Sequence, residues 1–249
     1  MLYINEFENI GEYQRIASEL PQPQLAYFKD QGKCHAITEP GPYGVFIVDE
    51  KGKRYTVDSW DSTRTDARFV KFSNEILNPG NGQPDNSIVI SKNWEYVNIL
   101  PIWQVEDVLL NVKTTTDPSV AVTDYNGLLN TSSAIEDAST KKGSRTLENY
   151  IPALMYAQQT KETFKGEELH AYVPAMGQYM QIIENLEQIN VALNKIHAKS
   201  FPTGSTSIWY SSTQHSYDRM WTLNNQDPGQ RVKAGYFGSG AYVLPLFSI

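Results

Sequence analysis

The sequence predicts an α+β fold, a mixed antiparallel sheet packed with two helices and long loops, and three observations lead to it. Runs of alternating or β-branched residues, typical of strands, occur in the first half of the chain and again near its end. Between them, apolar residues recur three or four positions apart, as in helices. Segments rich in Gly, Pro, Asn and Ser separate these runs and predict loops.

The N-terminal part of the chain predicts a short arm rather than a domain. Apolar residues from Ile10 to Leu20 recur at helical spacing and stop at Pro21-Gln22-Pro23, which predicts a short helix followed by a break. The segment Leu25–Phe28 is a candidate strand, and Glu39-Pro40-Gly41-Pro42 is a connector. We therefore expect residues 1–42 to form an N-terminal arm or docking segment, because they carry too few apolar side chains for a core of their own.

The main domain is expected to span residues 43–249 and to begin with a hairpin over residues 43–60. Two β-rich runs, Tyr43–Val48 and Arg54–Asp58, flank a short turn that contains Gly52. Further strands are predicted at Arg68–Phe72 and Ser87–Ser91, with the Gly- and Pro-rich loop 78–86 between them.

The middle of the chain predicts a loop and then two helices. Residues Asn111–Lys142 are rich in Thr, Ser, Asp and Gly, which predicts a long loop. A first helix is expected between Thr146 and Phe164, with Pro152 in its first turn. A second is expected from about Met176 to His197, where the apolar stripe predicts a core-facing surface: Tyr179, Ile182, Ile183, Leu186, Ile189, Leu193 and Ile196.

The C-terminal part turns to β structure again. Polar or Gly-rich breaks separate four predicted strands: Ser207–Ser212, Arg219–Asn224, Arg231–Tyr236 and Ala241–Phe247.

Composition limits the classes of function. The 28 acidic and 21 basic residues give a net charge of −7, which argues against a nucleic-acid partner. No apolar run approaches the roughly 20 residues of a membrane helix, so no membrane insertion is expected. The start lacks the basic and apolar regions of a secretory signal, which favours assembly in the cytoplasm. The 15 tyrosines suit a recognition surface or an ordinary sheet equally well.

Catalysis is not predicted, because a nucleophile, a base and an orienting group do not occur in a suitable pattern. The four histidines lie far apart, so no metal site is expected, and no phosphate-binding glycine motif occurs. Ser212 and His215 would lie on opposite faces of a strand. The pairs Glu167-Glu168 and Lys141-Lys142 are interpreted as solvated charges. We therefore expect no enzyme and no cofactor.

Several segments together resemble C-type-lectin-like domains of bacterial and phage surface proteins, including the variable proteins of diversity-generating retroelements. The matching motifs are Ala171–Tyr179, Gln188–Ile196, Trp209–Gln214, Met220-Trp221 and Asp124–Gly127 with Asn130-Thr131. The resemblance implies a C-type-lectin-like fold over Tyr43–Ile249 that displays a binding surface. Related formylglycine-generating enzymes hold copper with paired cysteines, and the single Cys34 excludes that chemistry.

The sequence departs from the family pattern at three places: Ala171 replaces a Trp, Trp209 and Tyr210 are transposed, and Tyr242–Pro245 lacks an Arg. Trp209–Thr213 is interpreted as a buried strand whose hydroxyls bond neighbouring backbone, rather than as a set of ligand contacts. The resemblance places ligand-binding residues on the loops that follow, with solvated turns as the equal alternative: Gln214, His215, Tyr217, Arg219, Asn225, Gln230, Arg231, Tyr236 and Phe237.

The opening segment, Glu12-Tyr13 through Pro23, resembles N-terminal segments of crAss-like phage virion proteins. We therefore expect a phage virion surface protein (a fibre, decoration or tail component) whose lectin-like domain binds a host-surface glycan or protein. The residues before Glu39 would dock to other virion proteins. The alternatives are a bacterial cell-surface adhesin with the same domain, or a purely structural virion component. A symmetric homo-oligomer and a monomer both remain open.

Overall fold

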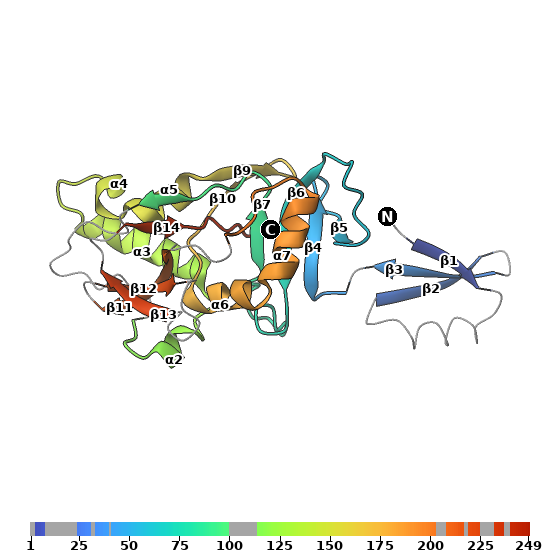
Figure 1. Ribbon diagram of the computed structural model, residues 1–249, viewed down its shortest axis with the longest axis horizontal. Coiled ribbons are helices and arrows are strands. Elements are labelled where there is room, and N and C mark those ends of the chain that lie inside the picture. The colour runs from blue at the N-terminus through green and yellow to red at the C-terminus, as the bar shows by residue number, and fades with distance from the viewer. Residues whose placement is uncertain are drawn as a thin grey trace.

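The computed structural model describes residues 3–7, 24–30, 33–39, 41–99, 114–202, 208–216, 219–224, 232–236 and 240–249, the first three stretches as backbone only. Helices and several sheets alternate along the chain, so the fold is α+β, as predicted (Figure 1). Within the described part of the chain, no helix is both long and apolar enough to cross a membrane.

The N-terminal residues form a three-stranded antiparallel sheet in the order β1-β3-β2, with bounds β1 Tyr3–Phe7, β2 Gln24–Asp30 and β3 Lys33–Glu39. Strand β2 confirms the strand expected at Leu25–Phe28, whereas β1 and β3 were not predicted. The helix expected over Ile10–Leu20 lies outside the described residues.

A four-stranded antiparallel sheet follows, in the order β5-β4-β6-β7, and it confirms the predicted hairpin and the two strands after it. Its bounds are β4 Gly44–Asp49, β5 Arg54–Thr56, β6 Ala67–Ser73 and β7 Ile88–Ser91. The hairpin turn is held by the buried carboxylate of Asp49, whose Oδ1 accepts from the backbone N–H groups of Lys51 and Lys53. Gly52 has a φ of 80°, which only glycine adopts readily.

The C-terminal strands and the earlier strand β8 form a five-stranded sheet in the order β13-β12-β11-β14-β8. Its bounds are β8 Val97–Ile99, β11 Ile208–Ser216, β12 Arg219–Asn224, β13 Val232–Tyr236 and β14 Ala241–Val243. The β11–β14 pair is parallel and the other pairs are antiparallel, so the sheet is mixed. A separate hairpin pairs β9 (Lys161–Phe164) with β10 (Glu167–His170) through a turn in which Lys165 and Gly166 both have positive φ.

The stretch Asn111–Lys142 is not one long loop, so that prediction is wrong. It contains the short helix α2 (Pro118–Ala121) and the 15-residue helix α3 (Gly127–Lys141). The buried residues of α3 recur at helical spacing, but they are small or polar: Gly127, Asn130, Thr131, Ala134 and Ala138. Small side chains let the helix lie close to its neighbours, and they also weaken the apolar signal in the sequence.

The two predicted helices each divide. The first consists of α4 (Leu147–Tyr150) and α5 (Pro152–Gln159), and the hairpin β9–β10 replaces its expected continuation to Phe164. The second consists of α6 (Met176–Glu184) and α7 (Leu186–Lys195). The break falls at Asn185, whose side-chain Nδ2 donates to the carbonyl of Gln181 at 2.9 Å. A side chain that bonds backbone locally in this way competes with a regular helix.

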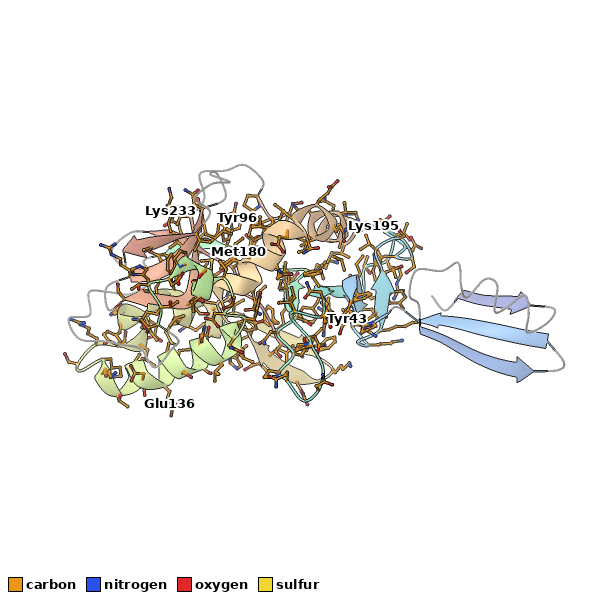
Figure 2. All side chains as sticks on the ribbon, turned by 90° about the horizontal axis from the view of Figure 1, so that it is seen from below. Tyr43, Tyr96, Glu136, Met180, Lys195 and Lys233 are labelled. Atoms are coloured by element: carbon orange, nitrogen blue, oxygen red, sulfur yellow. The ribbon has the colours of Figure 1, made fainter. Side chains whose placement is uncertain are left out.

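One cluster of buried residues joins the two larger sheets through α6 and α7. Ile47 and Val70 come from the four-stranded sheet, Leu193 from α7, and Trp209 and Trp221 from the five-stranded sheet. Helix α7 packs on β4 and β6, and Lys195 near its end donates from Nζ to the carbonyl of Val57 at 2.7 Å (Figure 2). The other face of the five-stranded sheet packs on α3, α4 and α5. This sheet is therefore fixed from both sides.

Candidate binding surface

The predicted ligand-binding residues belong to the ends of β11, β12 and β13. Ser216 pairs with Arg219 across the β11–β12 hairpin, and Arg219 pairs in turn with Tyr236 on β13. His215, Arg219 and Tyr236 therefore lie at one end of the three strands. Tyr217 follows Ser216 directly and Phe237 follows Tyr236, but both lie outside the described residues. We call the set His215, Tyr217, Arg219, Tyr236 and Phe237 the hairpin-end group.

Three other predicted residues belong to the opposite end of the strands. Asn225 follows the last residue of β12, and Arg231 precedes the first residue of β13, with Gln230 before it. These three lie outside the described residues, but the antiparallel pairing of β12 with β13 sets the end from which their loop leaves. Strand β12 has six residues, which corresponds to a separation of roughly 20 Å between the two ends. By their positions in the sequence, eight of the nine predicted residues thus adjoin two opposite strand ends, and Gln214 belongs to neither group.

Gln214 was expected to be an exposed ligand contact, and this prediction is wrong, because the residue is fully buried. Its backbone carbonyl accepts from the N–H of Thr115 at 3.0 Å, and its side-chain Oε1 accepts from the hydroxyl of Thr114 at 3.3 Å. Its Nε2 donates to the carbonyl of Ser216 at 2.9 Å. Gln214 therefore ties β11 to the segment that leads into α2.

His215 is half-buried and lies against Trp221 of β12. The two ring centroids are 4.8 Å apart and the rings meet edge to face at 70°. The indole Nε1 of Trp221 donates to the carbonyl of Thr115 at 2.8 Å, and the side chain is buried. Trp221 is a core residue, as expected. No local pattern in the sequence indicates that residues 114–115 cover this part of the sheet, because they lie about a hundred positions away in the chain.

Beneath the hairpin-end group, the hydroxyls of Ser211 and Thr213 bond neighbouring groups, which confirms the buried-strand interpretation for these two residues, whereas the buried hydroxyl of Ser212 has no hydrogen-bond partner within the described residues. Ser211, Ser212 and Thr213 are all buried. The hydroxyl of Ser211 donates to the carbonyl of Trp221 at 2.7 Å, and the hydroxyl of Thr213 accepts from the N–H of Met176 at 2.9 Å.

A buried carboxylate lies at the centre of these contacts. Asp124 is 1% exposed, and its Oδ2 accepts from the Thr213 hydroxyl at 2.7 Å and from Asn130 Nδ2 at 2.8 Å. Its Oδ1 accepts from the backbone N–H of Asn126 at 3.1 Å. Hydrogen bonds of this kind compensate the loss of water around a buried charge. Asp124, Asn130 and Thr213 with the backbone of Met176 are called the Asp124 junction below.

Two further buried side chains extend the junction toward the four-stranded sheet. The hydroxyl of Thr131 accepts from the N–H of Val173 at 3.1 Å. Gln178 accepts from the N–H of Ala175 at 3.0 Å and donates from Nε2 to the carbonyl of Asn86 at 2.9 Å and to the Tyr172 hydroxyl at 3.1 Å. Burial raises the pKa of Tyr172 above its usual value, while the bond from Gln178 opposes that rise. The phenol therefore stays neutral.

Two glycines permit the close approach on which the junction depends. A Cβ on Gly127 would lie 2.8 Å from both the Ala175 nitrogen and the Val173 oxygen. A Cβ on Gly177 would lie 2.6 Å from the Asp124 carbonyl oxygen. Real Cβ atoms do not approach backbone atoms this closely, so the start of α3 and the start of α6 can meet only through glycines.

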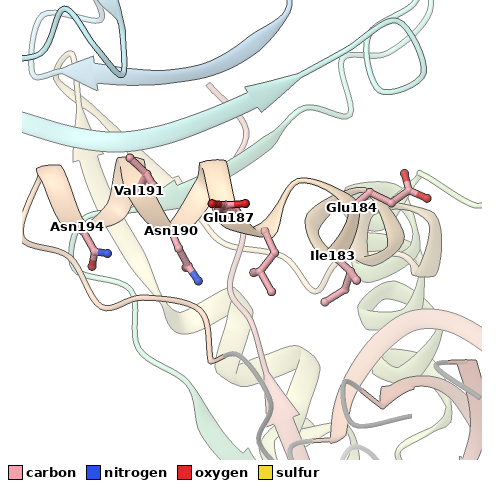
Figure 3. Close-up of a pocket in the computed structure, with 7 residues that line it drawn as sticks. Ile183, Glu184, Glu187, Asn190, Val191 and Asn194 are labelled. Carbon is pink, nitrogen blue, oxygen red and sulfur yellow. The ribbon is translucent and has the colours of Figure 1, made fainter. Parts of the chain in front are cut away.

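A shallow groove of about 530 Å³ runs along α6 and α7. Its lining combines apolar, acidic and amide side chains: Ile183, Glu184, Leu186, Glu187, Asn190, Val191 and Asn194 (Figure 3). The Asn190 side chain bonds the backbone N–H and carbonyl of Phe201, and Asn194 Oδ1 accepts from Ser200. Because these amides already hold the loop after α7, the groove offers a ligand mainly apolar surface and two carboxylates.

In the part of the chain that the structure describes, the titratable residues do not gather into a metal site. Among the described residues, no three His, Cys, Asp or Glu side chains lie close enough to hold an ion together. His170 contacts the Gln158 carbonyl through Nδ1 and Glu168 through Nε2, and His197 contacts the Ser62 carbonyl. The Lys161–Glu168 and Lys141–Asp137 ion pairs are on the surface, as expected for solvated charges.

Comparison with known proteins gave one informative likeness. No family model matches the sequence, and no curated protein matches it. Among solved structures, the chain is similar to a fimbrial protein from Bacteroides ovatus ATCC 8483, with a TM-score of 0.53 and 13% sequence identity. The likeness covers 82% of this chain and 48% of the fimbrial protein, so the chain spans about half of its neighbour's length. At this identity the likeness concerns the fold alone.

Proposed function

We propose that this chain is a non-catalytic attachment protein of a phage virion, built around a C-type-lectin-like domain. One observation carries the proposal. The motifs that resemble lectin-like domains are far apart in the sequence, yet their polar residues meet in the Asp124 junction. Convergence of this kind supports a shared scaffold, because each motif supplies a bond that the others need. Resemblance of each segment by itself would not require these polar residues to meet in space.

The chemistry of the junction supports display rather than catalysis. Asp124 and Thr213 are buried and already hydrogen-bonded to each other, so neither is available to a substrate. Their bonds fix β11 relative to α3 and α6, and this rigid base would support loops that bind. The proposed ligand is a host-surface glycan or protein, and the proposed contacts are the hairpin-end group. Asn225, Gln230 and Arg231, which adjoin the opposite end of the strands, would belong to a separate surface.

The proposal gives the N-terminal sheet a different task. Among the described strands, β1, β2 and β3 pair only with one another, so they do not extend either of the larger sheets. A three-stranded sheet is independently stable only where it buries a hydrophobic face or packs against another element, so we propose a packing partner for it. We propose that this partner is another virion protein, with no role for nucleic acid or membrane insertion.

A second candidate is a bacterial cell-surface adhesin or fimbrial subunit with the same domain. The likeness to the fimbrial protein favours it, because the likeness covers most of this chain. Neighbouring genes would distinguish the two: portal and capsid genes indicate a virion, and pilin or lipoprotein genes indicate a cell surface. Antibody labelling of purified particles and of intact bacterial cells would test the same choice directly.

The attachment itself is tested with the full chain on a glycan array and on a panel of bacterial cells. Tyr217→Ala and Tyr236→Ala should each weaken binding by about 1 kcal/mol or more, as expected for interface tyrosines. They should change the free energy of unfolding by only about 0.5 kcal/mol. Arg231→Ala, at the opposite end of the strands, is the matched control and should leave binding unchanged.

Trp221→Ala should have the reverse effect, with a loss of roughly 3–5 kcal/mol in stability because a core side chain is removed. If both tyrosine variants bind as the wild type does while Arg231→Ala loses binding, the site belongs to the opposite end. If no variant alters binding to any target, the proposed attachment role is wrong and the protein is a structural component.

A further inference from the structure

The loop between β6 and β7 ends in an exposed tip with unusual backbone geometry. Residues 79–85 are exposed, and Gly80, Asn81 and Gly82 have φ values of 70°, 54° and 78°. Positive φ is uncommon for any residue except glycine, and Asn tolerates it better than most. Nothing lies within 4 Å of the position that a Cβ would take on Gly80 or Gly82. Asn81 is thus followed by a glycine whose backbone nitrogen is not shielded by a side chain.

We infer that Asn81-Gly82 is a site of spontaneous deamidation and isomerisation. In this reaction the backbone nitrogen of Gly82 attacks the side-chain amide carbon of Asn81. A C–N bond closes a five-membered succinimide ring, the backbone nitrogen loses its proton to solvent, and the side-chain nitrogen leaves as ammonia. Water then opens the ring at either carbonyl, which yields aspartate or isoaspartate. The reaction needs only water, and it needs a tip that can move.

The same dipeptide occurs once more, in a setting that should prevent the reaction. The backbone N–H of Asn126 donates to Asp124 Oδ1, and the Asn126 carbonyl accepts from the N–H of Asn130 at 2.8 Å. Gly127 is buried against the backbone of residues 173–175. Ring closure at Asn126 would require the start of α3 to open first, and such local opening costs free energy.

The base of the β6–β7 loop should stay in place when its tip is modified. Leu77 is fully buried, and its carbonyl accepts from the N–H of Asn86 at 2.9 Å. The Asn86 carbonyl is in turn held by Gln178. The tip itself has one backbone bond among its described contacts, from the N–H of Gln83 to the Gly80 carbonyl at 3.0 Å. Modification would add a negative charge at the surface and leave the fold intact.

Peptide mass spectrometry of the full-length protein after timed incubation in mildly alkaline buffer tests this inference. Asn81 should convert to a mixture of aspartate and isoaspartate. Asn126 should convert more than about tenfold more slowly, which corresponds to an opening free energy above about 1.4 kcal/mol. In denaturant the two rates should become similar, because both sequences are Asn-Gly.

Asn81→Gly is the matched variant, since glycine keeps the positive φ and removes the reactive amide. This variant should fold as the wild type does and should accumulate no isoaspartate in the tip. Equal native rates at Asn81 and Asn126, or a stable Asn81 that reacts only in denaturant, would overturn the inference.

Discussion

Thr213 on β11 donates a hydrogen bond from Oγ1 to the carboxylate of Asp124 over a distance of 2.7 Å, although the two residues are 89 positions apart in the chain. Both side chains are buried. The same hydroxyl accepts from the N–H of Met176, so one threonine joins β11 to the start of α6 and to the turn before α3. This one side chain therefore supplies two of the bonds that hold the arrangement beneath the hairpin-end group.

Thr213→Val should lower the free energy of unfolding by about 2–4 kcal/mol. The valine keeps the shape of the threonine but leaves the Met176 N–H and one carboxylate oxygen with fewer partners, and each buried unsatisfied group costs about 1–3 kcal/mol. Urea unfolding measures the change. Thr213→Ser restores the hydroxyl and should lose only about 0.8 kcal/mol for the missing methyl group. If valine and serine are equally destabilising, packing and not the hydrogen bond is what Thr213 supplies.

Gly127→Ala should destabilise the protein although alanine is the better helix former. Alanine gains up to about 1 kcal/mol in helix propensity. Its Cβ would lie 2.8 Å from two backbone atoms of residues 173–175, and we expect displacement of the segment to cost about 1–3 kcal/mol more than that gain. Thermal unfolding measures the difference. Ser132→Ala, on the exposed side of the same helix, is the control and should be neutral or slightly stabilising. A Gly127→Ala variant as stable as the wild type would show that α3 can shift freely.

The hairpin of β4 and β5 and the helix α3 show where the sequence was informative about the fold and where it was not. The hairpin of β4 and β5 was predictable because alternation and a turn glycine are local signals. Helix α3 was missed because its buried face is made of Gly, Asn, Thr and Ala rather than large apolar residues. A search for small residues at helical spacing would have found it.

The candidate surface was predictable only in part. Gln214 was wrongly predicted to lie on the surface. Residues 114–115, which cover it, come from a distant segment that no local pattern links to β11. The division of the predicted site into two ends could have been foreseen. Successive hairpin loops leave a sheet from alternate ends, so the turn before Arg219 and the loop after Asn224 cannot meet without a bend in β12.

Asp85→Asn should destabilise the protein at neutral pH and become harmless in acid. Burial opposes ionisation of Asp85, but hydrogen bonds from Ser87 and the ion pair with Lys71 at 2.9 Å outweigh it and lower its pKa. The resulting stability is present above the unfolded-state pKa of about 3.9 and is lost as pH falls toward the lower native value.

The expected loss for Asp85→Asn at neutral pH is about 1–2 kcal/mol, a moderate value because the carboxylate is partly exposed. This loss is measured by comparing the free energies of unfolding of both proteins between neutral pH and about pH 3. The two curves should begin to converge below about pH 4, where the side chain takes up its proton in the unfolded state, and should meet as the native carboxylate is protonated at lower pH. A difference that does not change with pH would assign the effect to the shape of the side chain rather than to its charge.

Arg64→Lys should destabilise the loop after β5 although the charge is kept. The guanidinium lies against two aromatic rings, 4.6 Å from the centroid of Tyr55 and 4.4 Å from that of Trp60. Its Nε and Nη2 atoms bond the two carboxylate oxygens of Asp66 at 2.9 and 2.6 Å. Lysine cannot stack or form this bidentate pair, so we expect a loss of about 1–2 kcal/mol. Salt screens charge but not stacking, so most of the loss should persist at high ionic strength.

Urea unfolding of the Arg64→Lys variant at low and high salt measures both effects. Arg68→Lys on β6, the strand that follows this loop in the chain, is the matched control, with an expected change within about 0.5 kcal/mol. The destabilisation should be accompanied by a change in the fluorescence of Trp60, because this ring loses the contact that covers one of its faces. If the loss disappears at high salt, Arg64 acts on the loop only through its charge, and the aromatic contacts contribute nothing measurable.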